Sequence, residues 1–588
     1  MNEPPASALR GGEWLVHRQP AERVFTPERF THEHRLVAGT VTAFETGEVR
    51  PARSRLEGKD WALARRLLRR SGEIGLLGVD VADADGGMHV DTVTSMIVSE
   101  RLSGSPSFGV TFGAQVNLVV LPVFLFGTSS QKAQYLPGLL SGELVGAYGL
   151  TEPGSGSDAR SIRTHAARQA DGSFILNGEK AWITNGGIAD LFVVFAKVDG
   201  EQFSAFLVER RFGGVTSGPE ERKMGLDGSS TTSVLLQDVR VPAGNLLGDI
   251  GKGHRIAFNV LNFARLKLGA TCSGGAVGAI GESARYAAAR RQFGQPIASF
   301  GAVRHKLGEM VARAYAVESL TYRMAGLVDA CLDSSSRGVS RPSAAVAAFE
   351  EFAIEASIAK VAGSEMLNFV LDENIQIHGG NGYGRDYPAE RHYRDSRVNR
   401  IFEGTNEINR LLIPGLLVRR AAEWRVPLLA AARTARESLE SRSAATGILS
   451  NEAAIVDRAK AAALVVIELA IEACGERFTD EQEVAMGVAD MLIDVLSADS
   501  AVLRAEAAAA ACAPDAALHA DAARVFANDA ASRVTVAGRQ ALAAIADAPR
   551  FAPRTIPPLA VEQAPINTVA PRRRLADEAV RRGAYPFA

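Results

Sequence analysis

The chain has 588 residues, too many for one hydrophobic core, so the sequence predicts two or more domains. A net charge of −2 provides no basic surface typical of a nucleic-acid-binding protein. The cysteines lie far apart without the spacing of a metal site, which predicts reduced thiols, no bound metal and a cytoplasmic location. They are Cys272, Cys331, Cys474 and Cys512.

The first residues, Met1-Asn-Glu-Pro-Pro-Ala, contain neither a basic segment nor an apolar one, which predicts no secretory signal. No uninterrupted apolar run reaches the length needed to cross a bilayer, so we expect no membrane insertion.

The first two blocks of the chain differ in their hydrophobic period. Residues 30–145 show helical periodicity, for example over 61–70 and 131–136, and predict a helical N-terminal domain. Residues 146–250 contain short apolar runs separated by Asp-Gly, Asn-Gly and Gly-Gly, which is typical of an antiparallel β domain. These runs are 174–176, 191–196, 203–208 and 233–236.

Helical periodicity returns over residues 251–425, which predicts a C-terminal helical bundle with one long helix over 344–375. After Pro427 an Ala-rich helical block reaches about residue 546, and we expect the Pro-rich end, 549–588, to be irregular. The fold class is therefore α+β, with residues 428–588 forming an additional helical tail domain.

Glu403 lies between an aromatic residue and a glycine in Arg400-Ile-Phe-Glu-Gly-Thr-Asn-Glu-Ile408. A carboxylate flanked by Phe402 and Gly404 can occupy an apolar pocket while its backbone closely approaches a ligand. Burial raises the pKa of a carboxyl group toward neutrality, which suits a base that removes a weakly acidic C–H proton. On this segment alone, an ordinary exposed helix glutamate is the alternative.

The surrounding motifs resemble those of the acyl-CoA dehydrogenase family, and they occur in its order and at its spacing. Together they are a strong signal, whereas each alone is weak. The motifs are residues 148–158, 177–186, 290–294, 376–380 and 401–405. The resemblance covers roughly residues 30–425, and with the tail the chain is most similar to the very-long-chain branch. It implies the acyl-CoA dehydrogenase fold, with FAD between the β domain and the helical bundle.

The resemblance divides the FAD contacts between two subunits. Tyr148, Thr151, Trp182 and Thr184 correspond to positions that line the flavin of their own subunit, and Ser157 offers a hydroxyl and an N–H group to the pyrophosphate and to substrate. Positions that reach the FAD of the neighbouring subunit are Arg290, Gln292, Phe293, Gln376 and Gly380. Thr405 and Glu407 are further FAD positions, although the family often has Gln where Glu407 stands. A plain Gly/Ser surface loop and a core Trp182 are the alternatives.

The same resemblance places Phe258, Asn259 and Arg265 on a helix along the acyl-CoA, with Gly404 beside the base. Asp is frequent in the family where Asn259 stands, and Arg265 could instead be a structural ion-pair residue. Some relatives carry their catalytic base at the position of Ala264. Because alanine cannot act as a base, Glu403 is the candidate base here.

Gly109 and Gly113 lie four residues apart, on one face if the segment is helical. They align with larger residues in medium-chain relatives, so their missing side chains would deepen an acyl tunnel. Helix-packing glycines are the alternative.

The implied reaction is α,β-dehydrogenation of long-chain acyl-CoA to trans-2-enoyl-CoA in fatty acid β-oxidation. Glu403 would remove the α proton while a hydride passes to flavin N5, with electron-transferring flavoprotein as the electron acceptor. We expect a homodimer whose tail covers the surface that a second dimer would use. An acyl-CoA oxidase and a homologue acting mainly as an assembly or interaction protein remain alternatives.

Overall fold

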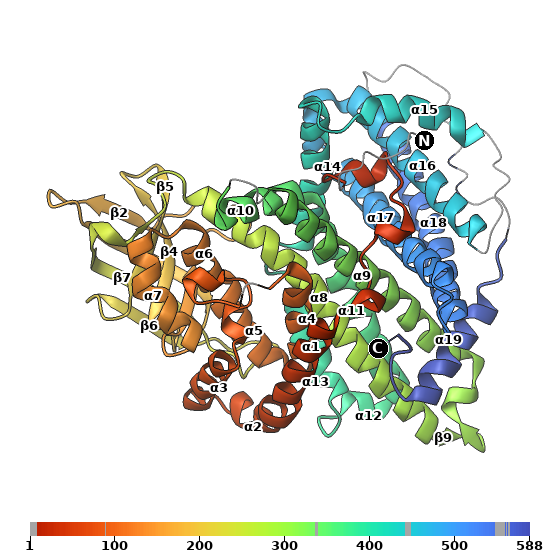
Figure 1. Cartoon of the computed structure of the whole chain (residues 1–588), viewed down its shortest axis with the longest axis horizontal. Coiled ribbons are helices and arrows are strands. Elements are labelled where there is room, and N and C mark those ends of the chain that lie inside the picture. The colour runs from red at the N-terminus through yellow and green to blue at the C-terminus, as the bar shows by residue number, and fades with distance from the viewer. Residues whose placement is uncertain are drawn as a thin grey trace.

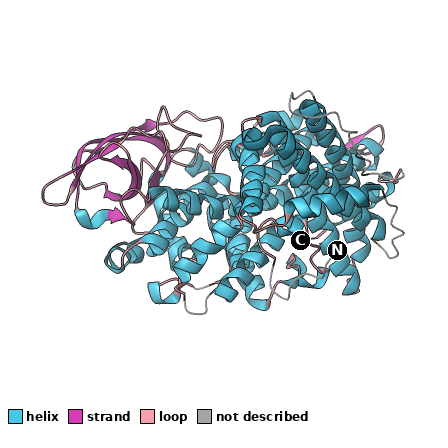
Figure 2. Ribbon diagram, turned by 90° about the horizontal axis from the view of Figure 1, so that it is seen from above, coloured by secondary structure: helices cyan, strands magenta, loops and turns pink. Residues whose placement is uncertain are grey.

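The computed structural model describes residues 9–88, 90–335, 339–440, 449–546, 559, 561 and 565–587. Figure 1 shows a sheet domain at one end, helices of the N-terminal domain below it and a large helical body at the other end. From above, the large sheet likewise lies at one end of the molecule, whereas a short strand is visible at the other end (Figure 2). The α+β class with an additional helical tail is confirmed.

Four helices of the N-terminal domain begin at side-chain caps, which are Thr31 before α1, Asp60 before α3, Asp91 before α4 and Thr128 before α7. The helices are α1 (His32–Phe44), α2 (Arg50–Glu57), α3 (Trp61–Glu73), α4 (Thr92–Arg101), α5 (Pro106–Gln115), α6 (Leu121–Phe126) and α7 (Ser129–Ser141).

One helical run in the described residues, Pro106–Phe126, is long and apolar enough to cross a membrane by length and composition, with a mean hydropathy of 1.8. Polar residues such as Gln115 and Asn117 interrupt it, so it is not an uninterrupted apolar run of the kind considered from the sequence alone. The run comprises α5, a π-helical turn (Val116–Val120) and α6, and 72% of its apolar window is buried inside the protein. Such burial is typical of a core helix in a folded domain.

The β domain is a mixed sheet, which corrects the expectation of an antiparallel one. Its path is β6-β7-β3-β2-β4-β5-β8. Most neighbouring strands are antiparallel, but β1 and β2 both pair with β4 in parallel. The bounds are β1 (Gly146–Gly149), β2 (His165–Arg168), β3 (Phe174–Thr184), β4 (Leu191–Val198), β5 (Gln202–Glu209), β6 (Val215–Glu220), β7 (Thr231–Val241) and β8 (Leu246–Leu247). The parallel pairs were missed because β1 contacts β4 rather than a strand that follows it through a short turn.

The C-terminal bundle breaks the expected 344–375 helix at Phe352. There α10 ends and α11 begins, and the buried Arg420 guanidinium donates to the carbonyl of Glu350 at 3.0 Å and to that of Glu351. The bundle contains α8 (Gly253–Ala289), α9 (Gly301–Ser335), α10 (Arg341–Glu351), α11 (Ala353–His378), α12 (Gly380–Tyr383), α13 (Ala389–Ser396) and α14 (Asn406–Ala422), with a small hairpin of β9 (Arg291–Gln292) and β10 (Gln295–Pro296).

The tail packs on this bundle. Its helices are α15 (Leu428–Glu440), α16 (Ser450–Cys474), α17 (Gln482–Ala510), α18 (Ala516–Ala546) and α19 (Val569–Arg582). The expected irregular end was wrong over α19, because Leu575, Ala576 and Ala579 bury one apolar face and Arg572 forms an ion pair with Glu309 of α9 at 2.8 Å.

Candidate active site

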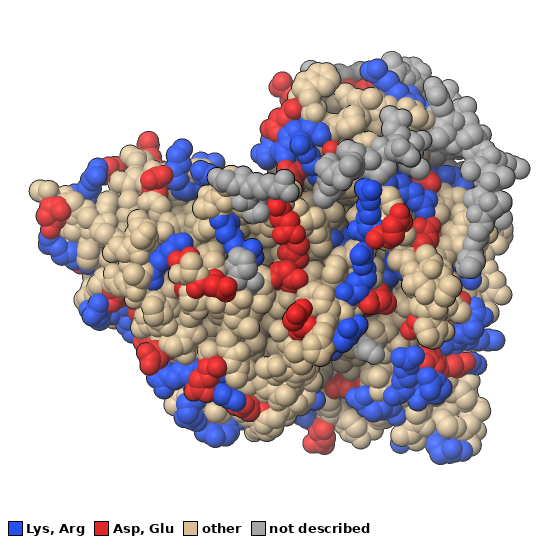
Figure 3. All heavy atoms as spheres, viewed as in Figure 1, with Lys and Arg blue, Asp and Glu red and all other residues tan. Residues whose placement is uncertain are grey.

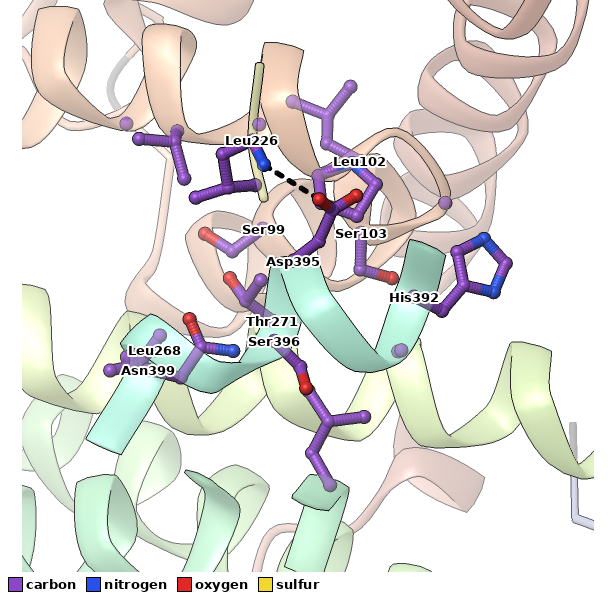
Figure 4. A pocket seen from close by; sticks show the side chains of 18 of the residues that line it. Ser99, Leu102, Ser103, Leu226, Leu268, Thr271, His392, Asp395, Ser396 and Asn399 are labelled. Atoms are coloured by element: carbon purple, nitrogen blue, oxygen red, sulfur yellow. Dashed lines mark hydrogen bonds between the residues drawn. The ribbon is translucent and has the colours of Figure 1, made fainter. Parts of the chain in front are cut away.

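A cavity of about 360 Å³ lies where the N-terminal domain, the β domain and the helical bundle meet. Gly109 and Gly113 line it from α5, and Thr184 lines it from the end of β3. Ala264 of α8 and Glu403 complete this part of the wall. Residues predicted from separate motifs therefore meet at one cavity, part of which is drawn in Figure 4.

Glu403 has a left-handed backbone, with φ of 57°, and Gly404 follows with φ of 80°. This conformation is unfavourable for a residue with a side chain and requires outside support. Arg265 Nε donates to the Glu403 carbonyl at 3.0 Å, and Lys360 Nζ donates to the Gly404 carbonyl at 2.7 Å. Asn409 Nδ2 donates to the same Gly404 carbonyl at 2.8 Å. Three side chains thus hold the turn that presents the carboxyl group to the cavity.

The Glu403 carboxyl group is in an environment that suits a base. Its Oε2 atom is shielded from solvent and has no hydrogen-bond partner among the described residues. Burial raises the pKa of Glu403 to about 7, while the positive charges of Arg265 and Lys360 act in the opposite direction. Near neutral pH the group can therefore both accept and release a proton.

The Glu403 carboxylate is close enough to Tyr148 for its charge to affect the Tyr148 hydroxyl. Burial and the Glu403 charge raise the pKa of Tyr148 well above its ordinary value, so its hydroxyl remains a hydrogen-bond donor. That hydroxyl is buried without a partner among the described residues, whereas the ring packs edge-on against Phe195. An unsatisfied buried donor indicates a polar ligand group nearby.

Trp182 projects from a bulge in β3. The β3–β7 register shifts between Lys180 and Ile183, and Trp182 has φ of 58° with 60% of its surface exposed. A bulge redirects a side chain, so the indole stands free of the sheet. Thr151 is half-buried on the segment that bonds to this bulge, its carbonyl accepting from Ala181 N at 2.9 Å, whereas Ser157 is exposed.

The other FAD positions lie far from this face within one chain. Arg290, Gln292 and Phe293 are exposed at the β9–β10 hairpin, where Phe293 has 92% of its surface accessible. Gln376 is exposed at the end of α11, and Gly380 is exposed at the start of α12. Figure 1 shows β9 and the sheet at opposite ends of the molecule. One chain therefore does not bring these two groups of residues together.

Several predicted residues have local roles or lie away from the cavity wall. Thr405 caps α14 by accepting from Ile408 N at 3.2 Å, and Glu407 is exposed in the first turn of that helix. Phe258 is 42% exposed, and the buried Asn259 side chain donates to Glu350 at 2.9 Å. Neither Phe258 nor Asn259 lines the cavity.

Sequence reasoning missed the residues that support the site. Lys360 and Asn409 hold the turn that carries Glu403. Lys180 forms a buried ion pair at 2.7 Å with Glu152, which lies in the same loop as Ser157. The signal for Lys360 was present, since a lysine in the apolar run Ala356-Ser-Ile-Ala-Lys-Val361 must have a polar partner. Nothing in the sequence identified that partner.

Four acyl-CoA dehydrogenase domain families match successive parts of the chain. The N-terminal domain family matches residues 31–143, the middle domain family 147–239 and the C-terminal domain family 251–415. A second C-terminal domain family of acyl-CoA dehydrogenases matches residues 458–551 in the tail. A probable acyl-CoA dehydrogenase of Bacillus subtilis is 44% identical over 516 residues, 87% of each chain. The chain belongs to the acyl-CoA dehydrogenase family.

Relatives within this family include the very-long-chain type. The human mitochondrial very long-chain specific acyl-CoA dehydrogenase is 42% identical over 352 residues, which cover 58% of this chain and 51% of the human one. An acyl-CoA dehydrogenase of Bacillus anthracis, solved in complex with FAD, superposes with a TM-score of 0.94 at 41% identity, over 98% of this chain and 100% of that one. Butyryl-CoA dehydrogenase of Megasphaera elsdenii has a TM-score of 0.60 at 33% identity and covers 66% of this chain and 99% of its own, so part of this acyl-CoA dehydrogenase has no counterpart there.

Proposed function

We propose that the protein catalyses FAD-dependent α,β-dehydrogenation of long-chain acyl-CoA to trans-2-enoyl-CoA in fatty acid β-oxidation. The observation that carries this proposal is the shielded Glu403 carboxyl group, with a pKa of about 7, at the wall of a cavity of about 360 Å³. An α C–H beside a thioester is weakly acidic, and a base with this pKa matches the task.

The residues present fit FAD. The unpartnered Tyr148 hydroxyl, the free Trp182 indole and Thr184 at the cavity wall leave donors and an aromatic surface for an isoalloxazine ring. When bound, FAD supplies the hydride acceptor. The exposed Arg290, with Gln292, suits a pyrophosphate bound between two chains.

Side chains of this protein perform the proton transfer and hold the base in position for it. Glu403 takes the α proton at its unpartnered carboxyl oxygen, while Arg265, Lys360 and Asn409 keep the backbone of the turn fixed. Fixed geometry of this kind lowers the barrier because no reorganisation occurs during the reaction.

Long-chain preference is supported by the α5 glycines. A Cβ atom added at Gly109 would have its nearest neighbour, the Leu102 carbonyl, at 3.6 Å, and one at Gly113 would meet Asn117 Nδ2 at 3.6 Å. Close packing therefore does not require glycine at either position. The missing side chains widen the cavity instead.

Substitution of Glu403 by Gln tests the assignment. Glu403→Gln keeps the size of the side chain and removes the base, so flavin reduction by palmitoyl-CoA in stopped flow should fall about 10³-fold or more. Bound flavin and acyl-CoA affinity should be retained. Glu423→Gln, at the exposed end of α14, is the matched control. Near-native reduction by Glu403→Gln would refute the role of this residue.

Electron-transferring flavoprotein is the acceptor we propose, by analogy with the family, for an enzyme located in the cytoplasm. Oxidation by molecular oxygen is the competing route. The yield of hydrogen peroxide per acyl-CoA consumed, compared with turnover on an artificial acceptor, distinguishes a dehydrogenase from an oxidase. A protein that serves only in assembly would show neither activity.

A further inference from the structure

The cavity extends far beyond Glu403. Its wall follows α8 from Ala264 to Arg285, a helical length of about 31 Å at 1.5 Å per residue. Glu282 and Arg285 of α8, His392 of α13 and Arg50 and Arg53 of α2 line the remote part. If acyl-CoA reacts at Glu403, only a long acyl chain reaches these residues.

The wall between the two ends is not purely hydrocarbon. Figure 4 shows the hydroxyl-bearing side chains of Ser99, Ser103 and Thr271 around the same space as Asp395. Asp395 is buried and accepts from Leu226 N at 2.7 Å. Polar groups at this depth disfavour a plain alkyl terminus and favour a chain that carries a polar group of its own.

Acidic groups at the remote end already have partners. Glu282 lies 3.5 Å from His392 Nδ1 and accepts from Asn374 Nδ2 at 3.1 Å. Arg50 is paired with Glu45, whose carboxylate lies 2.6 Å from its guanidinium. The charge of Arg50 is therefore compensated, whereas Glu282 faces a positive charge only when His392 is protonated.

Arg53 is different. Its Nη2 donates to the Gly104 carbonyl at 2.9 Å, and in the part of the chain that the structure describes it forms no ion pair. Burial and the neighbouring positive charges of Arg391 and Arg50 lower the pKa of Arg53. A guanidinium has five N–H donors and stays charged, so a bound anion would relieve this unfavourable environment.

We propose that the remote end of the cavity binds a carboxylate at the ω end of a long acyl chain, with Arg53 as its main partner. The inference rests on the proposed function and names its substrate class, the CoA monothioesters of long dicarboxylic acids. Arg285, which is exposed and whose Nη1 donates to the Gly583 carbonyl at 2.6 Å, adds a positive charge to the cavity wall beyond Arg53.

The test compares palmitoyl-CoA with the CoA monothioester of hexadecanedioic acid, which has the same length and an ω-carboxylate. Flavin reduction gives kcat/KM for both substrates, and calorimetry on the Glu403→Gln background gives both affinities without turnover. Arg53→Gln should lower the ω-carboxyl to palmitoyl ratio at least about tenfold in both measurements, because a charge-assisted hydrogen bond is lost. Arg55→Gln, on the exposed side of the same helix and paired with Asp60, should leave the ratio unchanged.

Equal losses for both substrates, or no change in the ratio, would overturn the proposal. Arg53→Lys covers the case in which Arg53→Gln does not fold. Arg53→Lys keeps the positive charge but lacks the planar guanidinium group, so it should lower the ω-carboxyl to palmitoyl ratio partially. An unchanged ratio would count against the proposal. Absence of flavin reduction by either substrate would refute the proposed function instead, and the affinity ratio would still decide the ω-carboxylate site.

Discussion

Glu403 combines a strained backbone with a carboxyl group shielded from water. Its neighbours in sequence, Phe402 and Gly404, indicated such an environment, and the structure gives the physical cause of the raised pKa, which is burial partly offset by Arg265 and Lys360. The raised pKa means that the fold disfavours the ionised form relative to a carboxyl group in water. This instability is what makes the group an effective base near neutral pH.

The pH dependence of flavin reduction reports this pKa. Because the pKa of Glu403 is raised from 4.5 to about 7, the group is mostly protonated below pH 7 and mostly ionised above it. The single-turnover rate with palmitoyl-CoA should therefore rise about tenfold per pH unit below neutrality and level off above it. A rate that is flat between pH 5 and pH 7 would contradict the burial-induced shift.

At the scale of elements, α5 positions Gly109 and Gly113, and the bulge in β3 positions Trp182. The sequence predicted these residues for the site but did not place them in space. The helical spacing of Gly109 and Gly113 predicted a shared face, and both line the cavity. The Trp182 bulge could not be predicted, because it depends on the register of β3 against β7, whose residues are distant in sequence. The same holds for Lys180, whose partner Glu152 lies before the strand.

A side chain at Gly113 should shorten the cavity. Gly113→Glu places a carboxylate in the space along α5, so kcat/KM for palmitoyl-CoA should fall at least about tenfold, while octanoyl-CoA is affected less. Gly39→Glu, on the exposed face of α1 with no atom near the added Cβ, is the control. A native preference for octanoyl-CoA over palmitoyl-CoA would contradict the role given to these glycines.

At the scale of the whole molecule, ion pairs attach the tail to the bundle. Arg504 of α17 is fully buried and lies 2.6 Å from Glu318 of α9, and Arg410 of α14 lies 2.7 Å from Asp490 of α17. Val488 and Leu492 on α17 are buried as well. A loosely tethered domain is therefore excluded, and the tail covers one side of the bundle (Figure 1).

We predict a homodimer with one FAD per chain. The β9–β10 hairpin carries exposed Arg290 and Gln292 at the end remote from Trp182, so a complete FAD site requires a second chain. Light scattering should give two chains per particle. Deletion after Pro427 exposes the surfaces of α9, α11 and α14 that the tail now covers and should cause aggregation or a change of assembly state. A tetramer, or a monomer that retains all of its flavin, would contradict this assembly.

We also predict that the protein remains in the soluble fraction at low ionic strength. Lys and Arg alternate with Asp and Glu over the face shown in Figure 3, without a large area of one sign. At the start of the tail, residues 428–443 contain three arginines, Arg433, Arg436 and Arg442, against Glu437 and Glu440. Arg433 and Arg436 lie on α15, whereas Arg442 lies outside the described residues. Because electrostatic binding to anionic lipid requires an excess of basic residues, sedimentation with anionic liposomes should leave the protein in the supernatant. Quantitative pelleting would contradict this.

The sequence by itself determined the family, the four-block order and the candidate base, because each depends on short motifs or on a local hydrophobic period. Tertiary structure decided how that base is held and what the cavity contains. Arg265 reaches Glu403 across 138 residues and Lys360 reaches Gly404 across 44, and neither contact leaves a periodic trace in the sequence. The parallel pairing of β1 with β4 and the remote Arg53 arise in the same way, since long-range contacts are set by packing of whole elements rather than by local propensity.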